Sequence, residues 1–451
     1  MTGAATPFPA GVPAVGKFRP TRLPAVEERT LGNGLRALAV RKPGIPLVQM
    51  RLVLPAARPK ATGADRARQV VLAETLESGT KQRDSVELAE ALQGMGASLG
   101  VSVDSEDVRL NGSTLSPSLP EYLGLVGELL AEPAFPKSEV EIERARKAQE
   151  VLLQRSEPAV IARAAIKRRL FGEHPYAGGL PDPEEVASVS AADLRRYFAT
   201  RVTARDGLLI LVGDLRPARA LDAAEAAFGS WTGAGRAARL PALPPVEAGP
   251  IVLVDRPGAA QSNIRIAGPA LTRRDARLPA LQLANMIFGG YFSSRLVENI
   301  RERKGYTYSP RSWIDHLLLG SVLNISADVG TEVTAPALLE TRYELGRMAT
   351  LAVDPEELDS ARRYLIGTTA LSTQTQSGLA EYLLALSLAG VGLDYLRDLP
   401  KRLEKVTVDD VRDAAAEYLA PTRLPTVILG DAKAVRDSLE TLDAVEDGPQ
   451  P

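Results

Sequence analysis

Short apolar runs alternate with longer amphipathic segments along this chain, and the pattern predicts strands in hairpins followed by helices. Two apolar runs separated by Pro43 and Gly44 predict the first hairpin, because these residues favour a turn. Later segments repeat their apolar residues with the period of a helix that buries one face. The strands and helices predicted for the first half cover residues 35–40, 47–54, 64–77, 85–95, 98–103, 107–113, 119–131 and 137–155.

The second half of the chain repeats this order of elements. One helix opens with Ser190 and Asp193, a pair that suits a reciprocal N-terminal cap. The same pattern returns at Thr407 and Asp410, 217 residues later, and an apolar strand ending in Gly-Asp follows each helix at that same separation. The elements predicted for the second half cover residues 251–255, 262–267, 276–288, 293–303, 307–314, 320–328, 332–350 and 355–371. Two elements that share one separation indicate an internal duplication.

The repeated hairpins and helix pairs predict an α+β fold made of two homologous domains, each a mainly antiparallel sheet covered by helices. We expect the first domain over residues 28–228 and the second over residues 250–445. Residues 229–249 contain three prolines and many small residues, which is typical of a linker. Residues 1–27 are expected to form a flexible tail, because the first sixteen residues carry no charge and lack the basic start of a signal peptide.

Composition narrows the class of protein. The chain has 451 residues, of which 45% are hydrophobic and 24% charged, as in a soluble globular protein. A net charge of −2 gives no basic field for nucleic acid. The longest apolar stretch, Tyr382–Leu393, is too short to span a bilayer, so we expect a cytoplasmic protein without a membrane partner.

Two counts restrict the chemistry further. The chain has no cysteine, so it has neither disulfides nor a thiolate nucleophile or metal ligand. Its two histidines, His174 and His316, lie far apart in the sequence, so no local pair of imidazoles can bind a metal. A structural role is the simpler expectation for each of them.

Two motifs resemble a known family. Residues 289–309 read GGYFSSRLVENIRERKGYTYS, and residues 172–179 read GEHPYAGG. The first is similar to the carboxy-terminal domain of the pitrilysin/insulinase metallopeptidases, inverted zincins that include mitochondrial processing peptidase, although Ile300 replaces the family's Leu. The second resembles the family's His-Pro-Tyr-Gly segment. The resemblance extends from about residue 28 over nearly the whole chain, and it implies two homologous domains that form half of a clam-shell chamber.

The zinc motif of the family is absent. The resemblance implies that His-x-x-Glu-His would occupy residues 70–74, but the chain has Val70, Ala73 and Glu74 where the family has its first His, its catalytic Glu and its second His. Glu143 and Glu150 keep the family's downstream spacing, and Glu150 falls at the position of the distal zinc ligand. One ligand of three cannot hold catalytic zinc, so we expect no metal in this chain. The simpler reading of these glutamates is a solvated helix face.

The family's second catalytic element is present. The resemblance maps an Arg and a Tyr seven residues later onto Arg301 and Tyr308, which would face the zinc across the closed chamber. A phenol can stabilise the oxyanion that forms during peptide hydrolysis, and a guanidinium can hold substrate carbonyls. The alternative is that Arg301 is a cation favoured at a helix C-terminus and Tyr308 an ordinary strand aromatic.

Four small residues precede this pair. One interpretation is that a turn of Gly289 and Gly290, with Ser293 and Ser294, lets the backbone of a substrate approach closely. The other is a plain helix break followed by a serine cap. The sequence does not favour either interpretation.

The combination of a lost zinc motif and a retained Arg/Tyr pair predicts a division of labour. The resemblance implies a subunit that is inactive alone and joins a homologous zinc-binding subunit in a heterodimer, with the zinc in that partner and a peptide as substrate. The alternative is a non-enzymatic scaffold or peptide-binding protein that retains the peptidase fold. The sequence leaves open whether the partner is a separate zinc subunit or another copy of this chain.

Overall fold

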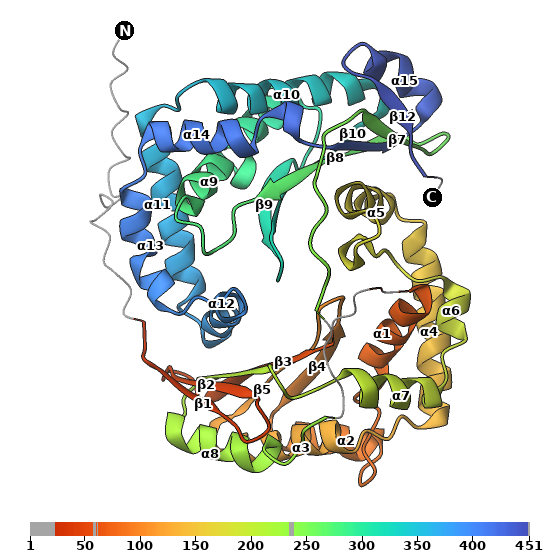
Figure 1. Ribbon diagram of the computed structural model, residues 1–451, viewed down its shortest axis with the longest axis vertical. Helices are drawn as coiled ribbons and strands as arrows, with labels where there is room; N and C mark the ends of the chain where they lie inside the picture. The colour runs from red at the N-terminus through yellow and green to blue at the C-terminus, as the bar shows by residue number, and fades with distance from the viewer. Residues whose placement is uncertain (1–22, 57–59, 61, 234–238, 450–451) are drawn as a thin grey trace, which may run out of the picture.

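The computed structural model of the chain describes residues 23–56, 60, 62–233 and 239–449. Most of the tail predicted over residues 1–27 therefore lies outside the described residues, as does part of the predicted linker. The described residues form two six-stranded sheets with helices packed against them, and Figure 1 displays the sheets in two lobes. The α+β class predicted from the sequence is confirmed, and the exact domain limits stay a prediction.

The first sheet has the strand order β1-β2-β6-β3-β5-β4. All neighbouring strands in it are antiparallel except β2 and β6. Its strands are β1 (Val26–Thr30), β2 (Arg36–Arg41), β3 (Leu47–Pro55), β4 (Ser98–Val103), β5 (Asp107–Leu115) and β6 (Leu208–Gly213). The helices of this half are α1 (Gly63–Thr75), α2 (Ser85–Gly94), α3 (Leu119–Ala131), α4 (Lys137–Arg155), α5 (Pro158–Phe171), α6 (Pro183–Ala187), α7 (Ala191–Arg201) and α8 (Pro217–Phe228).

The second sheet has the order β12-β7-β11-β8-β10-β9, which matches the first sheet except that the edge strand beside β7 comes from the end of the chain. Its strands are β7 (Ile251–Asp255), β8 (Gln261–Ala270), β9 (Arg311–His316), β10 (Ser321–Gly330), β11 (Thr426–Gly430) and β12 (Val445–Asp447). The helices of this half are α9 (Leu278–Asn285), α10 (Thr334–Thr350), α11 (Pro355–Ser372), α12 (Gln376–Leu388), α13 (Asp394–Glu404), α14 (Val408–Tyr418) and α15 (Ala432–Glu440).

The capping patterns behind the predicted duplication are present at equivalent helices. At α7, the Asp193 backbone N–H donates to Ser190 Oγ over 3.1 Å, and the Ser190 N–H donates back to Asp193 Oδ2 over 3.2 Å. The same reciprocal bonds join Thr407 and Asp410 at α14, with lengths of 3.1 and 2.8 Å. Each cap satisfies two backbone donors that a helix start would otherwise leave unpaired, so it fixes the first residue of its helix.

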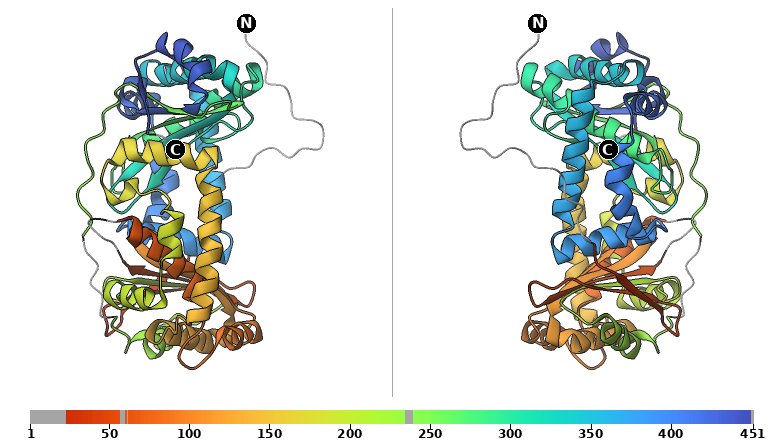
Figure 2. Two further views of the ribbon diagram at one scale, coloured as in Figure 1. Left: turned by 90° about the vertical axis from the view of Figure 1, so that its right-hand side faces the viewer. Right: turned by 90° about the vertical axis from the view of Figure 1, so that its left-hand side faces the viewer.

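Each half lends one helix to the sheet of the other. α5 packs on β8 and β11 of the second sheet, and α12 packs on β3 and β6 of the first. Figure 1 shows both helices between the two sheets, and Figure 2 shows how α4 and α11 run along the long axis toward them. The apolar side chains that α5 buries against the second sheet include Ile166, Leu170 and Phe171. The two halves therefore share their hydrophobic cores.

No helix among the described residues is long and apolar enough to cross a lipid bilayer.

Candidate functional site

The structure brings Arg301 and Tyr308 together. The guanidinium carbon of Arg301 lies 4.5 Å from the centre of the Tyr308 ring and 4.9 Å from the centre of the Phe292 ring. Both rings are exposed, Tyr308 to 79% and Phe292 to 61%. A cation over an aromatic face is favourable, so the three side chains form an exposed stack with the guanidinium near both rings. The motif contains Phe292, but no periodicity in the sequence indicates that its ring would meet Arg301.

The backbone around Arg301 departs from the predicted α-helix and strand. Two π-helical segments, η3 (Met286–Gly290) and η4 (Val297–Arg303), flank the turn that carries Phe292. π-helical turns are uncommon and recur at functional sites. Strand β9 begins at Arg311, four residues later than predicted, so Tyr308 lies in the loop before it.

Local hydrogen bonds hold this loop in place. Gly305 has a φ of +66°, and the Tyr306 N–H donates over 2.8 Å to the Ile300 carbonyl, which closes the end of η4. The Thr307 hydroxyl then donates over 2.6 Å to the Asp328 carbonyl on β10. Tyr308 therefore follows a tethered residue, although its own ring is exposed.

The small residues of the predicted turn occupy different environments. A Cβ on Gly289 would lie 3.0 Å from Ser312 Cβ on β9, so close packing against that strand accounts for this glycine. Ser294 is 1% exposed and its hydroxyl has no hydrogen-bond partner in the described part of the chain. Ser293 is exposed and Gly290 half-buried. Direct contact with a substrate stays a prediction, and the geometry allows it most readily at Gly290 and Ser293.

Where the resemblance maps the zinc motif onto the sequence, the structure has a network of ion pairs. The Lys147 ammonium lies 2.8 Å from Glu74 of α1 and 3.1 Å from both carboxylate oxygens of Glu150 on α4. Arg146 donates over 2.6 Å to Glu74 and over the same distance to Glu143. The two glutamates at mapped ligand positions therefore face one ammonium group. Glu143 and Glu150 lie on a partly exposed face of α4 and pair there with Arg146 and Lys147.

Electrostatics favours the charged form of this network. Burial alone would raise the pKa of Glu74, but hydrogen bonds and attraction from Lys147 and Arg146 outweigh it and hold that pKa below its usual value. Burial would lower the pKa of Lys147, but its bonds to Glu74 and Glu150 raise it instead. Within the described ranges, no group of three or more histidine, aspartate or glutamate side chains is arranged to hold a metal ion. The donor set does not fit zinc, which prefers nitrogen or sulfur ligands in a tetrahedral arrangement.

The two histidines have structural contacts. His174 Nδ1 accepts the Tyr176 N–H over 3.1 Å, and its Nε2 lies 3.0 Å from the Pro241 carbonyl oxygen. At the end of β9, His316 Nδ1 lies 2.7 Å from the hydroxyl of Ser321, the first residue of β10. Burial lowers the pKa of His316 to about 4, with a smaller contribution from the positive charge of Arg273.

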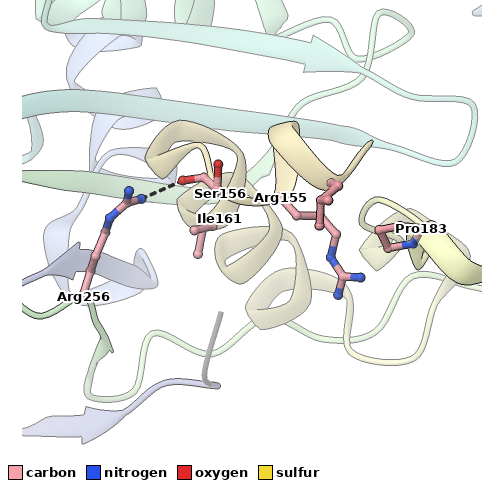
Figure 3. Close-up of a pocket in the computed structure, with 6 residues that line it drawn as sticks. Arg155, Ser156, Ile161, Pro183 and Arg256 are labelled. Carbon is pink, nitrogen blue, oxygen red and sulfur yellow. Dashed lines mark hydrogen bonds between the residues drawn. The ribbon is translucent and has the colours of Figure 1, made fainter. Parts of the chain in front are cut away.

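A surface pocket lies apart from these residues, where α4 meets α5. It has a volume of about 390 Å³. Arg256, which directly follows β7 in the second half, lines it and donates over 2.9 Å to the Ser156 carbonyl. Figure 3 shows Arg256 on one side of the α5 segment and Arg155 on the other. Arg155 pairs with Asp182, so this rim is already neutralised in part. Among the described residues that line the pocket, Ser156 donates its hydroxyl over 2.7 Å to the Leu153 carbonyl.

Comparison with known proteins agrees with this architecture. A family profile described as insulinase (peptidase family M16) matches residues 72–184, and one described as peptidase M16 inactive domain matches residues 188–365. The fold and the matched residues define a peptidase-type two-domain protein. The chain belongs to peptidase family M16, the insulinase family.

Several relatives and solved structures span nearly the same length. The chain is 22% identical to an uncharacterized zinc protease of Streptomyces coelicolor, over 90% of each protein. It is 23% identical to a non-peptidase homolog of Helicobacter pylori, over 80% of this chain and 84% of that protein. A peptidase M16 inactive domain from Pseudomonas fluorescens superposes with a TM-score of 0.79 at 24% identity, covering 90% of this chain and 98% of that one. A protease from Helicobacter pylori gives 0.81 at 19% identity, covering 91% and 100%.

Proposed function

We propose that this chain is the non-zinc subunit of a heterodimeric zinc metallopeptidase of the cytoplasm. In this proposal it binds the peptide substrate and contributes Arg301 and Tyr308 to transition-state stabilisation at the zinc of a homologous partner. Each two-domain subunit would form half of a clam-shell chamber. The observation that carries the proposal is the exposed stack of Arg301 with Tyr308 in a chain whose own zinc position holds an ion-pair network.

The geometry of the stack suits this role. With aromatic rings packed against it, the guanidinium keeps its in-plane N–H groups as the donors available to substrate carbonyls. Its Nε lies 3.1 Å from Glu302, so the two terminal nitrogens remain the donors best placed for a ligand. The Tyr308 phenol, on an exposed ring beside this cation, could donate to a developing oxyanion. The proposal assigns positioning to Arg301 and charge stabilisation to Tyr308.

A second candidate function is a non-enzymatic scaffold or peptide-binding protein. The ion pairs of Lys147 favour it, because they neutralise Glu74 and Glu150 at the mapped zinc position without a metal ion. One relative from Helicobacter pylori carries the name non-peptidase homolog. A homodimer in solution would support this candidate, since neither copy would supply zinc.

The test uses the chain alone and with a homologous partner that carries His-x-x-Glu-His. Alone, the chain should bind no stoichiometric zinc and hydrolyse no peptide. With the partner, Tyr308→Phe should reduce kcat by about 10²- to 10³-fold, the usual effect of losing one oxyanion donor, and leave the affinity of the subunits unchanged. Tyr343→Phe, an exposed tyrosine on α10, is the matched control. Unchanged turnover in Tyr308→Phe, or zinc-dependent hydrolysis by the isolated chain, would contradict the proposal.

A further inference from the structure

A cluster of charges separate from the Arg301 stack lies between α1 and α4. Glu74 on α1 and Glu143 and Glu150 on α4 surround two cations, Arg146 and Lys147. The side chain of Lys147 is only 16% exposed, whereas that of Arg146 is 53% exposed. Lys147 is therefore the inner cation of this cluster, and Arg146 covers it from the solvent side.

The position of the ammonium coincides with a site that the sequence maps independently. Residues 74 and 150 correspond to the second histidine and the distal glutamate of the family's zinc site. The structure brings both of them within 3.1 Å of the same Lys147 nitrogen. Two ligand positions 76 residues apart in the sequence thus converge on a cation that belongs to the chain itself.

We propose that the Lys147 ammonium occupies the position mapped to the family's zinc ion and has the structural role there that a bound metal would have. It neutralises the carboxylates of Glu74 and Glu150 and so couples the end of α1 to α4 without any ion from solution. This proposal does not depend on a role for Arg301 or Tyr308.

Charge and chain connectivity explain why a metal would not displace it. A divalent cation entering the cluster would meet two resident positive charges within a few ångströms, and like charges repel strongly where solvent is partly excluded. Lys147 is also part of the helix that carries Glu150, so the effective concentration of its ammonium group near that carboxylate is set by the fold. It does not depend on how much metal the solution contains. The α1–α4 contact is therefore expected to be insensitive to chelators and to added zinc.

A further contact gives this coupling a consequence for the sheet. Glu77, one turn after Glu74, accepts a hydrogen bond from the backbone of Val101 on the edge strand β4. The end of α1 thus contacts the edge strand directly. An ion pair that fixes α1 against α4 also helps to fix the position of this sheet edge.

The experiment measures thermal unfolding and Mn²⁺ binding of the full-length chain. The unsubstituted chain should have the same Tm in chelator, in excess MnCl2 and in excess ZnCl2. Lys147→Met should lower the Tm by about 2–4 °C, because it leaves Glu74 without its inner partner. Lys137→Ala is the control, since Lys137 is 84% exposed on the same helix and should change the Tm by less.

Removal of both cations tests the metal position itself. The double variant Arg146→Gln/Lys147→Met leaves Glu74, Glu143 and Glu150 without either cation, so its Tm should fall further than that of Lys147→Met, because like charges then lie close together.

Three outcomes would overturn the proposal. They are stoichiometric Mn²⁺ or Zn²⁺ binding by the unsubstituted chain, an unchanged Tm in Lys147→Met, and a folded double variant whose Tm is not below that of Lys147→Met. Should that double variant fail to fold, Glu74→Gln replaces it. Glu74→Gln should lower the Tm as Lys147→Met does, and the two changes combined should cost less than their sum; full additivity would also overturn the proposal.

Discussion

At the scale of single residues, the Arg301/Tyr308 pair and the absence of the zinc motif could be found from the sequence because each depends on spacing. Arg301 and Tyr308 keep the spacing that the family resemblance supplies, and the structure brings them into contact. Phe292 and Lys147 could not be assigned in this way. Their roles depend on rotamers and on which helix lies opposite, and neither leaves a periodic signal in the chain.

His316 gives a prediction at the same scale. Its folded pKa of about 4 lies below the ordinary value of 6.5, mainly because burial disfavours the charged ring. Between pH 6.5 and 4 the unfolded chain binds this proton more readily than the folded chain, so stability falls as the pH falls through that window. The loss should reach about 2–3 kcal/mol at pH 4 and be absent above pH 7.

Urea unfolding at pH 7 and pH 4.5 measures this effect. In His316→Gln the side chain can still bond to Ser321 but cannot titrate, so the variant should lose less stability between the two pH values than the unsubstituted chain. An equal loss in both proteins would assign the acid sensitivity to other groups.

At the scale of elements, capped helices and apolar strands were predictable because their signals are local. The helix expected over residues 293–303 instead becomes the π-helical η4, and the strand expected from residue 307 starts at Arg311. Packing accounts for the difference, since η3 fits against β9, where Gly289 approaches Ser312 closely, and η4 packs on α10. Such tertiary constraints override the local periodicity on which the prediction was based.

The turn between β9 and β10 gives a second prediction. Glu106, on the turn between β4 and β5, accepts the Leu318 N–H over 3.0 Å and the Tyr176 hydroxyl, and Tyr176 also accepts the Leu319 N–H over 3.4 Å. These bonds join the hairpin of one half to the other half. Glu106→Ala should therefore reduce the free energy of unfolding by about 1–2 kcal/mol, because it leaves two donors without their charged acceptor.

Hydrogen exchange distinguishes the loss of these hydrogen bonds from a general loss of stability. Amides of residues 317–320 should exchange faster in Glu106→Ala under conditions in which α8 and α15 are unchanged. Glu90→Ala, at an exposed position on α2, is the control. Uniformly faster exchange over the whole chain, without a local effect at this hairpin, would contradict the claim that the Glu106 hydrogen bonds hold the turn between β9 and β10.

At the scale of the whole molecule, the duplication could be predicted from the sequence. The packing of α5 and α12 on the sheet of the opposite half could not. The equivalent helices α5 and α12 each carry apolar side chains that would suit either sheet, so the sequence does not say which sheet each one covers. In the structure, strand residues of the first sheet such as Leu208 and Ile210 belong to the same core as Leu379 and Leu383 of α12. Side chains of α5 form a core with Val254 and Leu429 of the second sheet.

Because α5 and α12 each pack on the sheet of the opposite half, we predict that the two halves do not fold independently. Residues 1–245 alone would leave the α12-facing side of the first sheet and the apolar face of α5 in water, and residues 246–451 alone would leave the corresponding surfaces of the second half exposed. Fully burying one large apolar side chain stabilises a fold by about 1.5–3 kcal/mol. The free energy lost by exposing a whole sheet face should therefore exceed the free energy of unfolding of a typical domain. Each half alone should aggregate or lack near-ultraviolet circular dichroism, whereas the co-expressed halves should elute together and unfold cooperatively. Two halves that each unfold cooperatively near the Tm of the full chain would show that α5 and α12 are not required to complete the cores.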